Sequence, residues 1–262
     1  MKISIVTIVF NEVGNIDKTL ESVYRQTYAE IEHIVADGGS TDGTYAKVQA
    51  FAEKWRNRSG VFSCASERDG GIYFGMNNGL ARCTGDYVIF CNAGDVFADD
   101  EVVAKLVSAA ESAAELPDLI YGDVASEIDG KVLSRTAHGE KFMPYGMPAC
   151  HESMMYNIAI IRKLKLRYDT TYRISADYKF TYQFVNASTR FCYVKIVVVV
   201  YEEGGVSKVN KWKGLAEACR ARKEVGGLSL LRRFFIRMAQ TAALLLSTYA
   251  GPLYRLIRLR KI

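Results

Sequence analysis

The stretch ISIVTIVFNE, residues 3–12, decides the fold. Its apolar part is rich in β-branched residues and has no polar alternation, which is typical of a strand buried on both faces. Residues 31–36 predict the next strand and residues 87–91 form another continuous apolar run, and polar residues follow both. Apolar positions at helical spacing lie between these runs. The N-terminal half therefore predicts alternating strands and helices, with a parallel sheet covered by helices.

Composition restricts the class of protein. The chain has 262 residues, of which 49% are hydrophobic and 24% charged, so a disordered tail, a fibrous repeat and a multi-span membrane protein are excluded. Six scattered cysteines form no CxxC motif and indicate a reducing compartment. The first apolar run is too short for a signal peptide, so we expect a cytoplasmic protein.

Charge is divided unevenly along the chain. Residues 211–262 hold twelve Lys and Arg but only Glu217 and Glu224, a local charge of +10, whereas residues 1–210 carry −5. We predict a helical, basic C-terminal extension. Such an extension is suited to polyanions or anionic lipid, although a solvated basic helix explains the composition equally well.

Polar clusters follow the predicted strands. They are TIVFNE (residues 7–12), DGGSTDGT (37–44), ERDGGIYFGMNN (67–78) and NAGD (92–95). Ligands of open parallel sheets bind beyond the carboxyl ends of the strands, so these clusters predict a binding site. A turn and a helix cap explain Ser40 and Asp42 without function, but not Asp37.

These four clusters, in this order and spacing, resemble family 2 glycosyltransferases with the GT-A fold, and most closely the subgroup that builds bacterial exopolysaccharide and O-antigen repeat units. The resemblance is dense over residues 1–100 and sparse over 147–207. It implies a glycosyltransferase domain over residues 1–210, with a nucleotide-sugar-binding half (1–100) and an acceptor-binding half (101–210), followed by the extension at 211–262.

The resemblance also implies which residues bind the nucleotide-sugar donor. They are Thr7, Asn11, Glu12, Asp37, Gly38, Asp69, Asn77 and Asn92. Relatives hold Mg²⁺ or Mn²⁺ with an Asp-x-Asp motif, but here those two places are Asn92 and Gly94, with Asp95 directly after. One carboxylate with phosphate oxygens can suffice for such an ion, so we expect Asp95 to be the metal ligand. A turn residue before Val96 is the alternative interpretation of Asp95.

Candidate catalytic and acceptor residues lie in the second half. Asp177 resembles the family's acidic residue that takes the acceptor proton, and a helix cap is its alternative role. His151 resembles a motif that contacts acceptor or phosphate, although a lone histidine is often structural. The segment 203–208, EGGVSK, resembles a loop that closes on the donor. From it we expect Gly205, Ser207 and Lys208 to contact the diphosphate.

The resulting prediction is an enzyme that adds one sugar, with inversion, to a polyprenyl-diphosphate-linked or saccharide acceptor in bacterial surface polysaccharide synthesis. Two apolar stretches with basic borders, over residues 229–262, predict peripheral contact with the cytoplasmic face of the inner membrane. A packed helix or a dimer interface is the alternative for this tail. A catalytically inactive scaffold and a basic nucleic-acid-binding protein are alternative functions, but the second leaves the four clusters unexplained.

Overall fold

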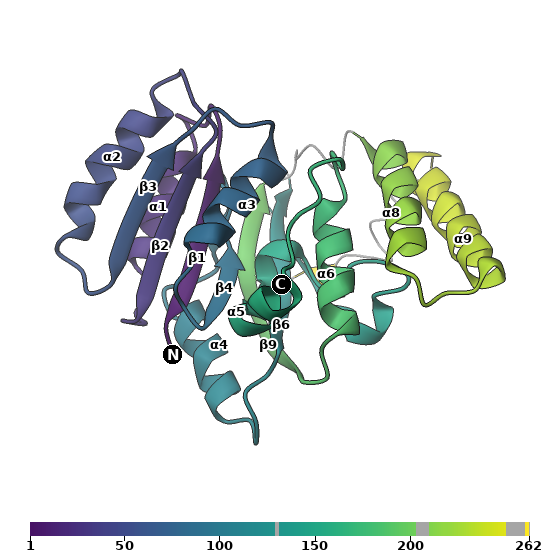
Figure 1. Ribbon diagram of the computed structural model, residues 1–262. Coiled ribbons are helices and arrows are strands. Elements are labelled where there is room, and N and C mark those ends of the chain that lie inside the picture. Colours follow the sequence, from purple (N-terminus) through teal and green to yellow (C-terminus); the bar gives the residue numbers. More distant parts are fainter. Residues whose placement is uncertain (129–130, 203–209, 250–259, 262) are drawn as a thin grey trace.

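The computed structural model describes residues 1–128, 131–202, 210–249 and 260–261, and its centre is one curved sheet (Figure 1). The N-terminal half of the sheet is parallel, with strand order β3-β2-β1-β4. Its strands are β1 (Ile3–Val9), β2 (Ile31–Asp37), β3 (Val61–Ser66) and β4 (Tyr87–Phe90), and its helices are α1 (Ile16–Tyr24), α2 (Thr44–Trp55) and α3 (Ile72–Arg82).

β1 shows why this half folds as the sequence predicts. All seven of its residues are buried. Ile3 and Ile5 pack into an apolar cluster with α1, α2 and α4, whereas Val6 and Ile8 pack into a second cluster with α3 and α6 on the opposite face. Because successive strand side chains point to opposite faces, a continuous apolar run is needed to fill both clusters. The predicted parallel sheet with helices on both faces is confirmed.

The second half of the sheet is mixed. β6 runs antiparallel to β7 and β8 and parallel to the long strand β9, while β8 joins this half to β4. Its elements are β5 (Val96–Phe97), α4 (Val102–Glu111), β6 (Leu119–Ile128), β7 (Lys131–Arg135), η1 (Glu140–Phe142), η2 (His151–Ser153), β8 (Met154–Asn157), α5 (Ile158–Leu164), α6 (Ala176–Asn186) and β9 (Phe191–Glu202).

The start of α1 has no side-chain cap. Asn15 occupies the cap position of α1, but its side chain does not cap the helix. The amide of Asn15 donates instead to Glu12 Oε2 at 2.9 Å. The polar residues after β1 therefore bond among themselves, at the edge where the binding site was expected.

The tail forms two helices and a short strand. α8 (Lys211–Val225) packs on α6, and α9 (Leu230–Tyr249) packs on α8 as the outermost helix (Figure 1). The predicted helices are confirmed for this part, but β10 (Arg260–Lys261) pairs with β7 rather than continuing a helix. Within the described ranges, no helix is both long and apolar enough to cross a membrane.

Arg222 fixes the two tail helices to the body of the protein. Its side chain is only 1% exposed. Its guanidinium donates to the Pro144 carbonyl at 2.9 Å, to the Tyr178 hydroxyl at 3.1 Å and to Gln240 Oε1 at 2.8 Å. These bonds join α8 to α6, to the loop after η1 and to α9. If α8 or α9 moved away from the domain, the buried guanidinium of Arg222 would lose these hydrogen bonds, which is costly for a buried charge. Arg222 therefore stabilises the packing of the tail against the domain.

Candidate active site

A large cleft opens at the carboxyl ends of β1, β2, β3 and β4. Its volume is about 2490 Å³, and its walls come from the loops after these strands, from η2, from the start of α6 and from α8 and α9. Sites for a single small ligand commonly measure about 300–1,000 Å³. The cleft therefore has room for two substrates side by side.

Asp37 supports the glycine-rich wall from behind. Its carboxylate is buried and accepts from the backbone N–H groups of Gly39 and Ser40 at 3.1 and 3.0 Å, and from the Ser66 hydroxyl. Gly38 and Gly39 line the cleft, whereas Asp37 does not. Gly39 has a φ of +83°, and a Cβ there would lie 3.0 Å from Arg68 Cα, so this position requires glycine.

Asn11 and Glu12 connect the loop after β1 to the loop after β2. The Asn11 side-chain oxygen accepts from Thr41 N–H at 3.0 Å, and the Asn11 N–H donates to Ser40 Oγ at 2.8 Å. Glu12 lines the cleft, while Asn11 lies exposed beside it. Of the two predicted donor residues, only Glu12 therefore faces the site.

Two other expected donor residues do not reach the cleft. Thr7 is fully buried within the sheet, where its hydroxyl bonds to His33 Nε2 at 2.9 Å and donates to the Cys91 carbonyl at 2.8 Å. The Asn77 amide instead bonds both backbone groups of Tyr168 at 2.9 Å. Thr7 lies on a buried face of the sheet and Asn77 on a face of α3 that packs against the Tyr168 segment, so neither side chain lines the cleft.

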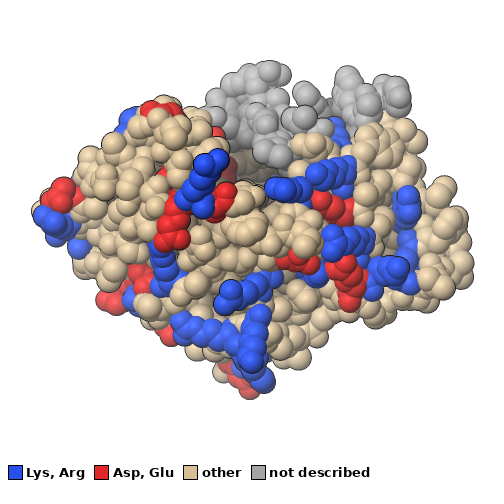
Figure 2. Space-filling view, turned by 45° about the horizontal axis from the view of Figure 1, so that its top comes forward, with Lys and Arg blue, Asp and Glu red and all other residues tan. Residues whose placement is uncertain are grey.

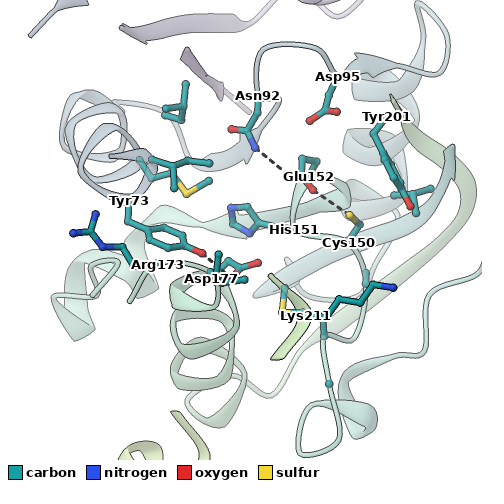
Figure 3. Close-up of a pocket in the computed structure, with 18 of the residues that line it drawn as sticks. Tyr73, Asn92, Asp95, Cys150, His151, Glu152, Arg173, Asp177, Tyr201 and Lys211 are labelled. Atoms are coloured by element: carbon teal, nitrogen blue, oxygen red, sulfur yellow. Dashed lines mark hydrogen bonds between the residues drawn. The ribbon is translucent and has the colours of Figure 1, made fainter. Parts of the chain in front are cut away.

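The start of α3 contributes a contact that the sequence did not suggest. Asp69 lines the cleft and accepts from Gly71 N–H at 2.8 Å, which shapes the turn before the helix. One turn further on, the Tyr73 hydroxyl donates to Asp177 Oδ1 at 3.3 Å (Figure 3). The third sequence cluster thereby brings a tyrosine to the expected catalytic carboxylate. Its place in ERDGGIYFGMNN was the only sequence signal for it.

Asp177 is the second residue of α6 and faces the cleft. Burial raises the pKa of its carboxyl above the usual range, while charge on nearby His151 and hydrogen bonding by Tyr73 oppose that shift in pKa. Ser175, not Asp177, holds the cap position of α6, but Asp177 lies in the first turn and its carboxyl also has a backbone hydrogen bond at Tyr178. A carboxylate whose pKa is raised by burial is a better proton acceptor than one in water.

His151 lies beside Asp177 in the wall of the cleft (Figure 3). It is 4% exposed, and both of its ring nitrogens have partners: Nε2 meets the Tyr168 hydroxyl at 3.1 Å and Nδ1 the Tyr156 hydroxyl at 3.4 Å. Its ring packs on Phe90 with centroids 4.8 Å apart. These contacts make His151 part of an aromatic cluster in the wall of the cleft.

A short chain of hydrogen bonds joins Asn92, Glu152 and Cys150 in the wall of the cleft. The Asn92 amide donates to Glu152 Oε1 at 2.9 Å, and the Cys150 thiol donates to Glu152 Oε2 at 3.0 Å (Figure 3). Asp95 lines the same wall. Across the part of the chain that the structure describes, no group of three or more His, Cys, Asp or Glu is placed to hold a metal. Any divalent ion here would depend on Asp95 and on oxygens of the donor.

Cationic side chains also line the cleft. Arg173, just before α6, and Lys211, at the start of α8, both line it, on opposite sides of the view in Figure 3, and the Arg173 guanidinium donates to the Gly70 carbonyl at 3.3 Å. Sequence reasoning missed them and Glu152, although Arg173 lies four residues before Asp177 and Glu152 directly follows His151. The expected diphosphate contacts Gly205, Ser207 and Lys208 lie outside the residues that the structure describes.

Comparison with known proteins identifies relatives of this chain. The family model "Glycosyl transferase family 2" matches residues 4–172. An uncharacterized glycosyltransferase of Mycobacterium tuberculosis is 31% identical over 68% of this chain, and the chain spans only 66% of its length, just under two thirds. A PGL/p-HBAD biosynthesis glycosyltransferase of Mycobacterium bovis is 29% identical over 78% of each chain.

Solved structures share the fold at low sequence identity. TarS of S. aureus in complex with UDP aligns with a TM-score of 0.68 and 18% identity, over 90% of this chain and 70% of its own. The mannosyltransferase PcManGT of Pyrobaculum calidifontis, in complex with GDP-Man and Mn²⁺, aligns with a TM-score of 0.66 and 16% identity, over 95% of this chain and 76% of its own.

Proposed function

Since the chain belongs to glycosyl transferase family 2, we propose that it moves one sugar from a nucleotide diphosphate donor to a lipid-linked or saccharide acceptor, with inversion at the anomeric carbon. As a member of this family with the GT-A fold, it is a nucleotide-sugar-dependent glycosyltransferase. The observation that carries the proposal is the Asp177 carboxyl, which faces a cleft shared with the strand-end loops and Asp95.

In this proposal the donor lies along the strand-end loops. The nucleoside occupies the wall made by Gly38, Gly39 and Asp69, where small residues allow close approach to the backbone. The diphosphate lies toward Asp95, and Arg173 and Lys211 line the same cleft. Cationic side chains in this position stabilise the negative charge that develops on the leaving group.

Asp177 acts as the general base in this proposal. The acceptor hydroxyl oxygen attacks the anomeric carbon while its proton passes to the Asp177 carboxylate. The bond from the anomeric carbon to the diphosphate oxygen breaks, and its electron pair leaves with the nucleoside diphosphate. A single displacement of this kind inverts the anomeric centre. The raised pKa of Asp177 suits this proton transfer.

The hydrogen bond from the Tyr73 hydroxyl allows the role of Asp177 to be tested through the pH dependence of kcat. It stabilises the charged form of Asp177, so replacing Tyr73 with phenylalanine is expected to raise the pKa of that carboxyl further. The base is active when deprotonated, so the acidic limb of the kcat profile should move to higher pH. The high-pH plateau should change little. A pH–rate profile of the variant with an unshifted acidic limb would contradict the role of this bond.

A divalent ion fits the Asp95 side of the cleft. Mg²⁺ is usually held by one or two carboxylates plus substrate phosphates, and Asp95 supplies one carboxylate. When bound, Mg²⁺ or Mn²⁺ would neutralise charge on the donor diphosphate. Asn92, which donates to Glu152, and Gly94 stand at the two places where the resemblance expects carboxylates.

Calorimetric titration with UDP-GlcNAc and GDP-mannose, with and without Mn²⁺, tests donor binding and the metal together. We expect Mn²⁺ to tighten binding of the accepted donor about tenfold, a gain of about 1.4 kcal/mol. Asp95→Asn should lose that gain, whereas Asp99→Asn, which removes an exposed carboxylate paired with Lys105, should keep it. Equal affinity in EDTA and Mn²⁺ would remove the metal from the mechanism. Donor binding without release of nucleoside diphosphate would indicate an inactive scaffold.

The acceptor side of the proposal rests on α9. Several apolar side chains of this helix are exposed, and in Figure 2 the end of the molecule where α8 and α9 lie is largely uncharged at its outer edge. They are Leu230, Leu231, Phe234, Phe235, Met238, Leu245 and Leu246. At 100° per residue these positions share one side of the helix, and Arg232 and Arg237 border it. We call this side the α9 apolar face.

The α9 apolar face fits the interface of an anionic membrane. Apolar side chains enter the acyl boundary while bordering guanidinium groups remain with the headgroups. Leu231 and Phe235 also line the cleft, so the cleft continues to this helix. A lipid-linked acceptor can then reach Asp177 from a membrane on which α9 lies. This supports the proposed location at the cytoplasmic face of a bacterial inner membrane and a role in surface polysaccharide synthesis.

A further inference from the structure

Glu217, in the middle of α8, binds the backbone directly before α6. Its Oε1 accepts from Arg173 N–H at 3.0 Å, and its Oε2 accepts from Ile174 N–H at 2.8 Å and from Ser175 N–H at 3.0 Å. One carboxylate from the tail thus engages three successive N–H groups. Asp177 follows two residues later.

This contact lies on the backbone that leads into α6, where the cap residue makes no side-chain capping bond. The first N–H groups of a helix lack partners within it, and a Ser at the cap position commonly accepts from one of them. Ser175 holds that position, but its hydroxyl donates to the Gly214 carbonyl of α8 at 3.1 Å and makes no capping bond. The negative charge of Glu217 also lies at the positive end of the α6 dipole. The orientation of the start of α6 therefore depends on α8.

We propose that Glu217 is a positioning residue for Asp177, so that α8 is part of the catalytic unit rather than of a separable extension. The inference rests on the proposed role of Asp177 as the base. Close packing supports it: a Cβ at Gly214 would lie 3.2 Å from Ile174 Cγ2, so α8 lies against the segment that leads into α6. A displacement of the base by about 1 Å can lower a rate about a hundredfold.

Glu224 provides a matched control on the same helix. Its carboxylate bonds to Lys179 of α6 at 2.6 Å and to the Tyr172 hydroxyl at 2.9 Å, so it also joins α8 to this part of the protein. Among the residues that the structure describes, its hydrogen bonds go to Lys179, Tyr172 and Arg220, and none goes to the N–H groups of residues 173–175. A purely structural role of the α8–α6 contact would make the two glutamates equivalent.

The test compares Glu217→Ala, Glu217→Gln and Glu224→Ala. Each is assayed for release of UDP from UDP-GlcNAc or of GDP from GDP-mannose, whichever the wild type turns over faster. We expect Glu217→Ala to lower kcat about a hundredfold with donor KM within about threefold, Glu217→Gln to be intermediate because it keeps one acceptor oxygen, and Glu224→Ala to stay near wild type. Equal loss of kcat in the two alanine variants, or none in Glu217→Ala, would overturn the proposal.

Hydrogen exchange gives a readout that does not need activity. Amide exchange at residues 173–175 should accelerate in Glu217→Ala but not in Glu224→Ala, and unchanged exchange would contradict the proposal. Asp177→Asn, measured in parallel, separates this inference from the function on which it rests. Full activity of Asp177→Asn would refute the base, whereas an inactive Asp177→Asn beside a fully active Glu217→Ala would refute only the positioning role.

Discussion

Asp177→Asn is expected to lower kcat for sugar transfer about 10²–10⁴-fold, the usual cost of losing a general base. Asparagine keeps the size of the side chain but cannot take the acceptor proton. The nucleotide wall, from Gly38 to Asp69, is untouched, so donor affinity should stay within a few-fold of wild type. Single-turnover transfer from labelled donor measures the rate, and calorimetry measures donor affinity.

Asp169→Asn is the control for this variant. Asp169 also contacts α6, through an ion pair with Lys179 at 2.7 Å that helps to hold the pKa of its carboxyl at about 2, but it does not line the cleft. Its loss should affect stability more than transfer. Substantial transfer by Asp177→Asn at saturating acceptor would show that another group accepts the proton.

Removing the α9 apolar face should release the protein from membranes. Leu230, Phe234 and Met238 are 78%, 57% and 54% exposed and do not line the cleft. Burying a side chain of this kind contributes about 1.5–3 kcal/mol. If half of that is realised at the interface, changing all three to serine costs about 3 kcal/mol, or roughly a hundredfold in binding. Flotation with phosphatidylglycerol vesicles measures this loss.

The wild type should bind anionic vesicles and bind them less, but still measurably, in high salt, because only the arginine contribution is screened. Leu116→Ser, which removes an exposed leucine between α4 and β6, should leave binding unchanged. If the wild type stays in solution with such vesicles at low salt, membrane binding is contradicted. The α9 apolar face would then serve in packing or dimerisation. Truncation after Gly227 is a less specific test, because it deprives buried Arg222 of Gln240.

Much of the N-terminal half could be predicted from the sequence because its information is local. Runs such as residues 3–10 and 87–91 have no polar face, so they had to become strands covered on both sides. Parallel strands joined by helices bring their carboxyl ends to one edge, and this alone gathered Glu12, Gly38, Asp69 and Asp95 around one cleft. The type of each residue and its place after a strand were sufficient for that prediction.

The orientation of individual side chains was decided by tertiary structure. Thr7 belongs to the first cluster, but its side chain lies on a buried face of the sheet. Side chains along a strand alternate between the two faces, so a residue within the strand need not face the cleft. Asn77 lies on a helix face that packs against Tyr168, and Asp37 supports its loop from inside. A sequence motif names the loop that reaches the site, but the direction of each side chain depends on the neighbours that fold against it.

The sequence by itself therefore determined the parallel half of the sheet, the cleft at its edge and most of the carboxylates there, although not Glu152. Only the tertiary structure decided how the Asp177 segment is held, because Tyr73 lies 104 positions away along the chain and Glu217 lies 42 positions from Ser175. A hydrogen bond over such a separation leaves no periodic signal. It exists because α3 and α8, each folded by its own local pattern, both contact the start of α6 in the folded chain.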